Sequence, residues 1–389
     1  MKEVLFYHPM IRNYRVELFA EINNKFKTHF FFTDYDSHSL LKDFQHINNE
    51  VAESIHASKI NDFTLLKKPK FFPNIYMFWK ALKRLCFAKE KIVVLTNFIS
   101  ILSLTLFLVS SFLRKKIIFY DLNWIYPDQM IKTKIYFPVF KWLIKKQKYI
   151  ITAGNYHKNF LRKNGAIKSE IVVAPTISEE FRGSLSELNK NGLILRDELG
   201  LKNKIIFLYI GRLVEYKGIN IMIEAYKKVR NIDTTLIIGG SGEMENYVKY
   251  QSKHIGNDVK YVGPIPSTKR WLYYALSDVV ILPSLFQKNK SVYCEGWGLV
   301  INEAFQVAKP VICTDACGAA REIVKDEIKD LYIRSGSVIS LSNAINLLLS
   351  SNFKRKSLGE KGQQIIKKFN SRNQRKAFVE MLDKVIKIK

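Results

Sequence analysis

Residues 205–229 read IIFLYIGRLVEYKGINIMIEAYKKV and contain a strand, a loop and a helix, in that order. The run 205–210 is continuously apolar, which is typical of a strand buried on both faces of a parallel sheet. After the loop, apolar side chains recur at the spacing of one helical face, at Ile219, Met222, Ile223, Tyr226 and Val229. This order predicts one unit of a doubly wound α/β sheet.

The same alternation of strand and helix extends in both directions along the chain. In the first half we expect strands near 3–7, 28–33, 92–96, 117–121, 149–152 and 171–174. In the second half we expect them near 205–210, 234–238, 259–262, 278–282 and 310–314. The pattern predicts an α/β chain with two Rossmann-like, doubly wound parallel sheets in series.

The length of 389 residues suits two domains, because single cores stop growing beyond about 250–300 residues. The helical periodicity breaks around 176–200, where we place the joint. We therefore expect a first domain over 1–180 and a second domain over 181–371. Residues 372–389 form a last basic helix, which we expect to pack back on the first domain.

The net charge of +27, from 62 Lys and Arg against 35 Asp and Glu, indicates an anionic partner. Residues 59–148 alone hold 18 basic and 4 acidic side chains. No recognisable nucleic-acid-binding motif accompanies this charge, so we do not expect nucleic acid. The four scattered cysteines do not form a disulfide framework, and a reducing compartment is expected.

Residues 67–89 interleave lysine and arginine with aromatic side chains, a composition typical of attachment to an anionic membrane surface. The alternative is a helix with one buried aromatic face and one solvated basic face. We interpret the apolar run directly after Met1 and Lys2 as a strand and not as a secretory signal. We therefore expect a cytoplasmic protein, peripherally associated with the inner face of the plasma membrane.

Residues 92–113 carry no charge over 22 positions, which is long enough to span a bilayer. However, the β-branched run 92–95 is followed by Thr96 and Asn97, and another strand-like run begins at Ile117. This order favours a strand, a buried helix and a strand. A membrane-dipping helix and a true span remain the alternatives.

Two glycine-containing loops follow strands in the second half. The first contains Arg212 and Lys217 just before a helix, where a guanidinium fork and an ammonium would hold a diphosphate. The second, residues 239–242 with Gly240 at its centre, lets the backbone approach a ligand closely. A glycine-rich turn without any ligand is the alternative for the second loop.

A third loop places Glu295 and Glu303 eight positions apart, with glycines between them. An ionised carboxylate only accepts hydrogen bonds, so one Glu suits a ribose diol and the other a sugar ring. The amides of Gly298 and Leu299, at a helix start, would point at phosphate oxygens. Two glutamates at this spacing often occur by chance, but the three loops in this order are difficult to explain by packing alone.

These motifs resemble the C-terminal domain of retaining GT-B glycosyltransferases of glycosyltransferase family 4. The resemblance covers residues 205–325 and rests on Gly211-Arg212-Leu213, Lys217-Gly218, Gly239-Gly240-Ser241-Gly242, Tyr261-Val262-Gly263, residues 277–284 and the E-x7-E motif from Glu295 to Glu303. A GT-B enzyme has two Rossmann-like domains facing a central cleft.

The resemblance implies a role for each matching residue. Arg212 and Lys217 would neutralise the diphosphate leaving group, which makes a metal or other cofactor unnecessary. Glu303 would hold the ribose of a nucleotide-sugar, and Glu295 would hold the donor sugar near its anomeric carbon. The backbone from Val262 to Ile265 would contact the base.

The first half departs from the family pattern, because the loop after its first strand lacks glycine and offers His8 or Arg12 instead. Where many members carry a histidine after a later strand, this chain has Asp121, our candidate acceptor-side residue; a capping aspartate is the alternative. His157 is a weaker candidate for that role. Asp34-Tyr35-Asp36 imitates a metal-binding D-x-D motif, and we interpret it as a turn at a strand end.

We therefore expect a metal-independent, retaining transferase that moves a hexose from a nucleotide-sugar to an acceptor. The basic and aromatic stretch favours a lipid-linked saccharide in the assembly of capsule, exopolysaccharide or O-antigen. The alternative is a non-catalytic, basic membrane- or polyanion-binding protein on a GT-B-like scaffold. A dinucleotide-dependent oxidoreductase is not expected, because no G-x-G-x-x-G follows the first strand.

Overall fold

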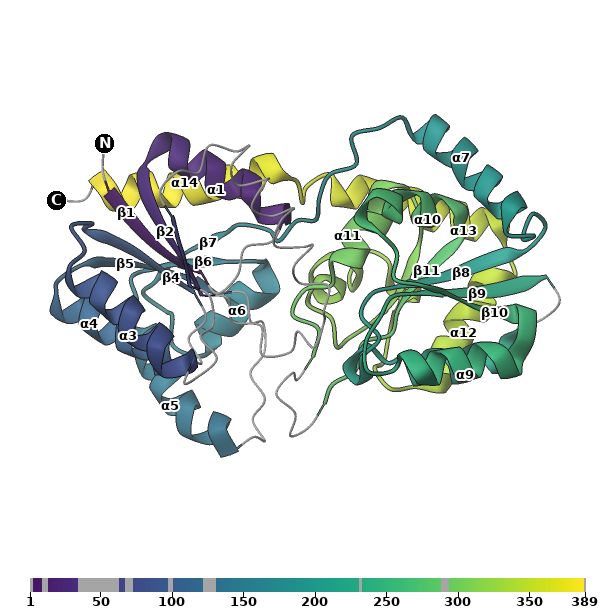
Figure 1. Cartoon of the computed structure of the whole chain (residues 1–389), viewed down its shortest axis with the longest axis horizontal. Coiled ribbons are helices and arrows are strands. Elements are labelled where there is room, and N and C mark those ends of the chain that lie inside the picture. The colour runs from purple at the N-terminus through teal and green to yellow at the C-terminus, as the bar shows by residue number, and fades with distance from the viewer. Residues whose placement is uncertain are drawn as a thin grey trace. The chain divides into compact units, whose positions relative to one another are not determined.

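The computed structural model describes residues 3–8, 13–33, 63–66, 73–96, 101–121, 131–230, 233–287 and 294–387. The chain divides into two compact units (Figure 1). The first contains Met1–Thr176 and Ser371–Lys389, and the second contains Ile177–Asn370. The first unit thus ends four positions before the expected boundary at 180, and the last helix belongs to it.

The first unit is built on a seven-stranded sheet in which all pairings are parallel. Its strands are β1 (Glu3–His8), β2 (Lys27–Thr33), β3 (Phe63–Leu66), β4 (Ile92–Thr96), β5 (Lys116–Asp121), β6 (Tyr149–Thr152) and β7 (Glu170–Val173). Their order across the sheet is β3-β2-β1-β4-β5-β6-β7. The six strands predicted in this half are confirmed, and β3 was not predicted.

Helices cover both faces of this sheet (Figure 1). α1 (Asn13–Lys25) and α14 (Ser371–Lys387) pack on one face. α3 (Pro73–Cys86), α4 (Ile101–Phe112), α5 (Ile131–Lys146) and α6 (Asn155–Lys163) pack on the other. On α14, Phe378 is buried in ring contact with Phe6 and Tyr120, so the end of the chain completes the core of the first unit.

The uncharged segment 92–113 forms strand β4 and helix α4, followed by β5, as the punctuated pattern predicted. Within the described residues, no helix combines the length and the apolar character that a membrane span requires. Helix α4 is not covered by neighbouring elements on every side, which corrects the expectation that this helix is fully buried. Leu108 and Phe112 are exposed, because neighbouring elements cover only part of the α4 surface.

The second unit contains a six-stranded sheet, also parallel in every pairing. Its strands are β8 (Ile205–Ile210), β9 (Thr234–Gly239), β10 (Val259–Gly263), β11 (Val279–Leu282), β12 (Val311–Thr314) and β13 (Tyr332–Ile333). Their order is β10-β9-β8-β11-β12-β13. Its helices are α7 (Leu185–Glu198), α8 (Ile219–Val229), α9 (Glu245–Ile255), α10 (Arg270–Leu276), α11 (Leu299–Gln306), α12 (Val338–Leu349) and α13 (Asn352–Ile366).

The expected joint at 176–200 is mostly helix, which corrects the interpretation of that stretch as a break. Ser184 caps α7 by accepting a hydrogen bond from the backbone N–H of Glu187. Near the other end of α7, Arg196 donates to Asp278 at 2.6 Å, and Asp278 also accepts from the N–H of Ile206. The helix therefore belongs to the second unit and fixes the start of β8.

Replacing Phe378 by alanine tests the assignment of α14 to the first unit. The lost ring leaves a cavity, and we expect a cost of about 3–5 kcal/mol in the free energy of unfolding. In urea unfolding, the transition of the first unit should move to lower denaturant while that of the second unit stays in place. Phe353→Ala, at an 80% exposed position on α13, is the control. A shift of the second unit instead would contradict the assignment.

Candidate functional site

The loops predicted to carry function follow β8, β9, β10 and β11 at their carboxyl ends. In the sheet, β9 and β10 lie on one side of β8, while β11, β12 and β13 lie on the other. The chain order therefore reverses between β8 and β11. Ligands of open α/β sheets bind at such a reversal, outside the carboxyl ends of the strands.

The loops after β8 and β9 are joined through their backbones. The N–H of Gly211 donates to Gly239 at 3.0 Å, and the N–H of Leu213 donates to Ser241 at 2.8 Å. Gly240 has φ of 149°, and a Cβ there would overlap the carbonyl oxygen of Gly211. Glycine at 240 is thus required by a close backbone approach, whether or not a ligand also comes near.

Val262 and Ile265, the candidate base contacts, lie against the loop after β9. A Cβ on Gly239 would overlap the Ile265 side chain and would lie 3.5 Å from that of Val262. The N–H of Gly240 donates to the carbonyl of Gly263 at 2.8 Å. The structure therefore brings these two residues next to the glycine-rich loop.

Lys217 and Glu295 form a buried ion pair, in which the Lys217 ammonium donates to the Glu295 carboxylate. The two residues follow β8 and β11 and are 78 positions apart. Lys217 is only 8% exposed. Burial favours a lower pKa for its ammonium, but Glu295 and Tyr216 together outweigh burial and the pKa of Lys217 is raised. The cation is therefore charged and held in place at neutral pH.

The backbone around both partners is fixed. Glu295 pairs with the loop after β12, accepting from the N–H of Gly318 and donating to the carbonyl of Ala316. Gly218, directly after Lys217, is left-handed with φ of 71°, and a Cβ there would overlap the carbonyl oxygen of Pro283. The β8 loop is thereby pressed against the end of β11.

Tyr216 lies beside both candidate cations, and the sequence did not single it out. Its hydroxyl accepts a hydrogen bond from the Arg212 guanidinium, and its ring lies 5.6 Å from both Arg212 Cζ and Lys217 Nζ. Burial, with the Glu295 charge nearby, raises the pKa of Tyr216. Tyr216 could have been identified from the sequence, because it directly precedes Lys217.

Glu303 is 6% exposed in the middle of α11, and two residues of α10 contact it. Arg270 donates to its Oε1 at 3.0 Å, and Tyr274 donates to its Oε2 at 2.7 Å. Arg270 also pairs with Glu179 at 2.6 Å. Burial raises the pKa of Glu303 although Arg270 and Tyr274 oppose this. No local pattern marked Arg270 or Tyr274, since α10 is distant in sequence.

Gly298 and Leu299 lie at the N-terminus of α11, as the sequence predicted. Gly298 is the residue before the helix, and Leu299 is the first residue of α11. The first amides of a helix have no carbonyl partner within it, so they are suited to binding an anion. Trp297 Nε1 donates to Asn302 at 2.9 Å, which ties the preceding loop to the helix.

The remaining candidates belong to the first unit. Asp121 is the last residue of β5 and is paired in register with Thr152. His8 ends β1 and contacts Arg15, and His157 is buried in α6. Arg12 and the Asp34-Tyr35-Asp36 motif lie outside the described residues.

No cluster of three or more His, Cys, Asp or Glu side chains suitable for a metal ion occurs in the described part of the chain. Cys313 and Cys317 are buried in the apolar core of the second unit.

A double-mutant cycle on Lys217 and Glu295 measures their interaction. Removing one partner of a buried pair leaves the other charge buried, so we expect Lys217→Met to cost about 3–5 kcal/mol in unfolding free energy. The Lys217→Met, Glu295→Gln double variant should recover most of this loss. Urea unfolding of the four proteins gives the coupling energy, and additive effects would show that the pair does not stabilise the loops.

Comparison with known proteins finds a family model that matches most of the second unit. Residues 193–365 match the family Glycosyl transferases group 1. The uncharacterized glycosyltransferase MJ1069 of Methanocaldococcus jannaschii is 23% identical, over 84% of this chain and 76% of the relative. The amylovoran biosynthesis glycosyltransferase AmsD of Erwinia amylovora is 25% identical, over 57% and 60%. The capsular polysaccharide biosynthesis glycosyltransferase CapM of Staphylococcus aureus is 26% identical, over 48% and 47%. The chain thus spans only about half the length of the last two relatives.

Solved structures share the fold over the whole chain. HepE of Anabaena, in complex with UDP and glucose, superposes with a TM-score of 0.72 at 17% identity, covering 99% of this chain and 100% of that one. WaaG, a glycosyltransferase involved in lipopolysaccharide biosynthesis, has a TM-score of 0.62 at 13% identity and covers 100% of both chains. The second unit therefore matches the group 1 glycosyl transferases, on a chain that has the GT-B fold of glycosyltransferases.

Proposed function

We propose that this chain is a retaining, metal-independent glycosyltransferase that moves a sugar from a nucleotide-diphosphate sugar to a saccharide acceptor. The observation that carries the proposal is the buried Lys217–Glu295 pair at the reversal of the second sheet, with Arg212 in the same loop as Lys217. The ammonium is suited to binding an anionic part of a ligand, and the carboxylate beside it is suited to accepting hydrogen bonds from hydroxyl groups of the same ligand.

In this proposal, Arg212, Lys217 and the first amides of α11 bind the diphosphate. As the bond between the anomeric carbon and the diphosphate oxygen breaks, its electron pair and the negative charge move to that oxygen. Positive groups already fixed at that position stabilise the charge without reorganisation. The diphosphate competes with Glu295 for the Lys217 ammonium, which leaves Glu295 able to accept from donor-sugar hydroxyls.

Glu303 is the proposed ribose ligand. Each carboxylate oxygen has two lone pairs, and Arg270 and Tyr274 use one on each oxygen. One acceptor position per oxygen therefore remains for two neighbouring ribose hydroxyls. The backbone at Val262 to Ile265 would contact the base. The HepE structures that share the fold contain UDP or UDP-glucose, which supports a nucleotide-sugar as the donor.

On the acceptor side, Asp121 at the carboxyl end of β5 is our candidate for orienting the attacking hydroxyl. The hydroxyl proton passes to the departing diphosphate oxygen as the new glycosidic bond forms on the same face of the sugar. Anomeric analysis of the product by NMR tests retention, and full turnover in EDTA tests independence from metal.

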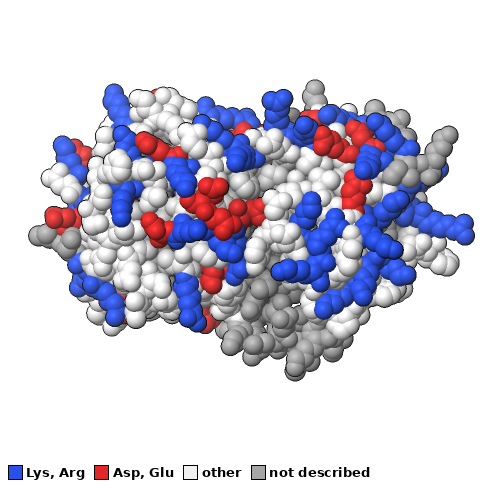
Figure 2. All heavy atoms as spheres, turned by 180° about the vertical axis from the view of Figure 1, so that it is seen from behind, with Lys and Arg blue, Asp and Glu red and all other residues white. Residues whose placement is uncertain are grey.

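The proposed acceptor is a lipid-linked saccharide in cell-surface polysaccharide assembly, at the inner face of the plasma membrane. The names of AmsD and CapM point to such polysaccharides. The positive charge also supports an anionic membrane surface: Lys and Arg side chains gather densely over the first unit, on the right of Figure 2.

A thermal-shift panel of nucleotide-sugars and free nucleoside diphosphates, with EDTA present, tests donor binding. A ligand at about 100 times its Kd adds about 2.7 kcal/mol, and we expect a raised Tm with one donor. Glu303→Gln should abolish the shift, whereas Glu224→Gln, at an exposed carboxylate of α8, should keep it. No shift with any donor, together with retained vesicle binding, would favour the non-catalytic alternative.

Donor affinity should fall on acidification from pH 8 towards pH 5. Because the pKa of Glu303 is raised from its ordinary 4.5, protonation begins above that value and removes acceptor positions for the ribose. Without a ligand, the raised pKa of Glu303 also stabilises the folded protein against unfolding. This contribution is fully present below pH 4.5 and is lost as the pH rises through the raised pKa. Calorimetric titration at several pH values measures the affinity, and an equal pH dependence in Glu303→Gln would contradict this role.

A further inference from the structure

Exposed apolar side chains gather at the amino edge of the first sheet, opposite the edge that ends in Asp121. Because the strands are parallel, the helices that lead into β4, β5 and β6 return to this edge, where α3, α4 and α5 end. Phe87 follows α3 and is 78% exposed, Phe112 ends α4 and is 86% exposed, and Trp142, just before the last turn of α5, is 48% exposed. These three residues define the docking edge.

The docking edge is also strongly basic. Residues 83–91, 112–117 and 142–149 contain ten Lys or Arg and a single carboxylate, Glu90. Glu90 is buried and held by Arg84, so it does not offset the surface charge. Lysines at helix C-termini stabilise the helix dipoles, but that effect does not account for the exposed aromatic side chains between them.

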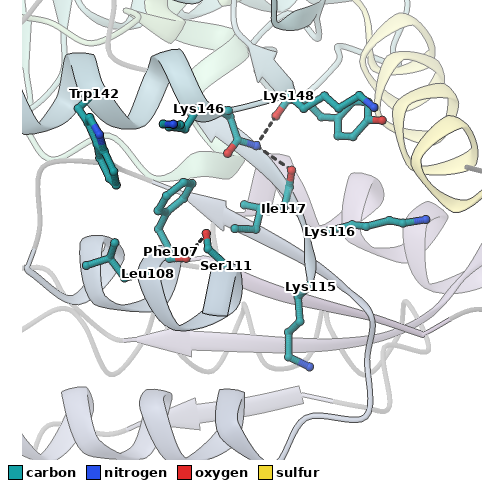
Figure 3. Close-up of a pocket in the computed structure, with 11 residues that line it drawn as sticks. Phe107, Leu108, Ser111, Lys115, Lys116, Ile117, Trp142, Lys146 and Lys148 are labelled. Atoms are coloured by element: carbon teal, nitrogen blue, oxygen red, sulfur yellow. Dashed lines mark hydrogen bonds between the residues drawn. The ribbon is translucent and has the colours of Figure 1, made fainter. Parts of the chain in front are cut away.

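A hollow of about 420 Å³ opens at this edge between α4 and α5. Figure 3 shows Trp142 of α5 on one side and Phe107 and Leu108 of α4 on the other, with Ile117 further along. Four of its eleven lining residues are lysines and none is acidic. The hollow therefore combines apolar walls with a cationic rim.

Two of these lysines stiffen the docking edge. The Lys115 ammonium donates to the carbonyls of Ala88 and Glu90, both at 2.8 Å, which ties the end of α4 to the segment after α3. Lys116 donates to the carbonyl of Val385 on α14 at 3.2 Å. Lys146 and Lys148 are exposed, which leaves them accessible to an anionic ligand.

We propose that the docking edge binds an anionic phospholipid bilayer, with the hollow taking the upper part of an acyl chain and Lys146 and Lys148 binding the lipid phosphate. Apolar walls fit the chain, a cationic rim fits the phosphate, and aromatic side chains are suited to the level of the headgroups. This inference rests on the membrane placement in the proposed function, but it does not depend on the transferase activity.

The position of the docking edge bears on the length of the acceptor. Asp121 and Lys116 are the two ends of β5, so the proposed catalytic edge is separated from the docking edge by about 16 Å of strand. A lipid-linked acceptor that carries several sugars would span this separation.

Flotation of the full chain with vesicles tests the docking edge. Vesicles of equal parts phosphatidylcholine and phosphatidylglycerol should bind the chain, and vesicles of phosphatidylcholine alone should bind it at least about tenfold less. The Phe112→Ser, Trp142→Ser variant should lose about tenfold or more in binding to the anionic vesicles, while Phe353→Ser, at the exposed position on α13, should not.

Charge reversal at Lys146 and Lys148 distinguishes binding at a defined site from general electrostatic attraction between the basic chain and anionic vesicles. We expect Lys146→Glu, Lys148→Glu to weaken vesicle binding by about tenfold or more. The exposed pair Lys354→Glu, Lys356→Glu on α13 makes the same change in net charge and should have much less effect. Equal losses in both pairs, or retained binding in the docking-edge variants, would overturn the proposal.

Brominated phosphatidylglycerol probes the hollow itself. It should quench tryptophan fluorescence in the parent, and the quenched fraction should shrink in Trp142→Phe. Glycerol phosphate should not displace the chain from vesicles; displacement would mean that the hollow binds free phosphates and not a lipid. Donor-induced thermal shifts should persist in every docking-edge variant, so failure of membrane docking and failure of the proposed transferase are distinguishable.

Discussion

The ion pair between Lys217 and Glu295 is the interaction on which the rest of the site depends. Two charges removed from water are stable only when geometry holds them together, because the desolvation cost is large. In this chain the carboxylate keeps the ammonium charged despite burial. The pair therefore holds a positive charge at a fixed position in the site.

Holding that pair restricts the backbone on both sides of it. Gly218 allows the β8 loop to press against Pro283, and the pairing of Glu295 with the loop after β12 fixes the other partner. Gly240 in turn allows the loop after β9 to pack against the β8 loop. The glycines that resemble ligand-binding motifs are thus required by the packing of one loop against another, whether or not a ligand also approaches them.

Much of this arrangement was predictable, because a buried parallel strand has a continuous apolar run and its loop follows at once. The loop with Arg212 and Lys217 was placed correctly for that reason, whereas Glu295 lies 13 positions after the end of β11. β3 and β13 were missed, since a strand of four residues and one of two residues leave little pattern. The 176–200 stretch was interpreted as a break because polar residues and Gly183 interrupt its periodicity, although Ser184 is a good helix cap.

Partners from distant elements could not be predicted. Arg270 and Tyr274 contact Glu303 only because α10 packs near α11, and no spacing in the sequence encodes that contact. The exposure of Phe112 was missed for a similar reason. An uncharged helix has the same composition whether its neighbours cover it fully or only in part.

The most direct test of the account is a crystal structure of the chain with a bound nucleoside diphosphate. The account predicts diphosphate oxygens within hydrogen-bond distance of Lys217 Nζ and of the Arg212 guanidinium, near the first amides of α11, with the Lys217–Glu295 contact lengthened. A diphosphate bound elsewhere, or bound there with Lys217 still paired only to Glu295, would contradict it.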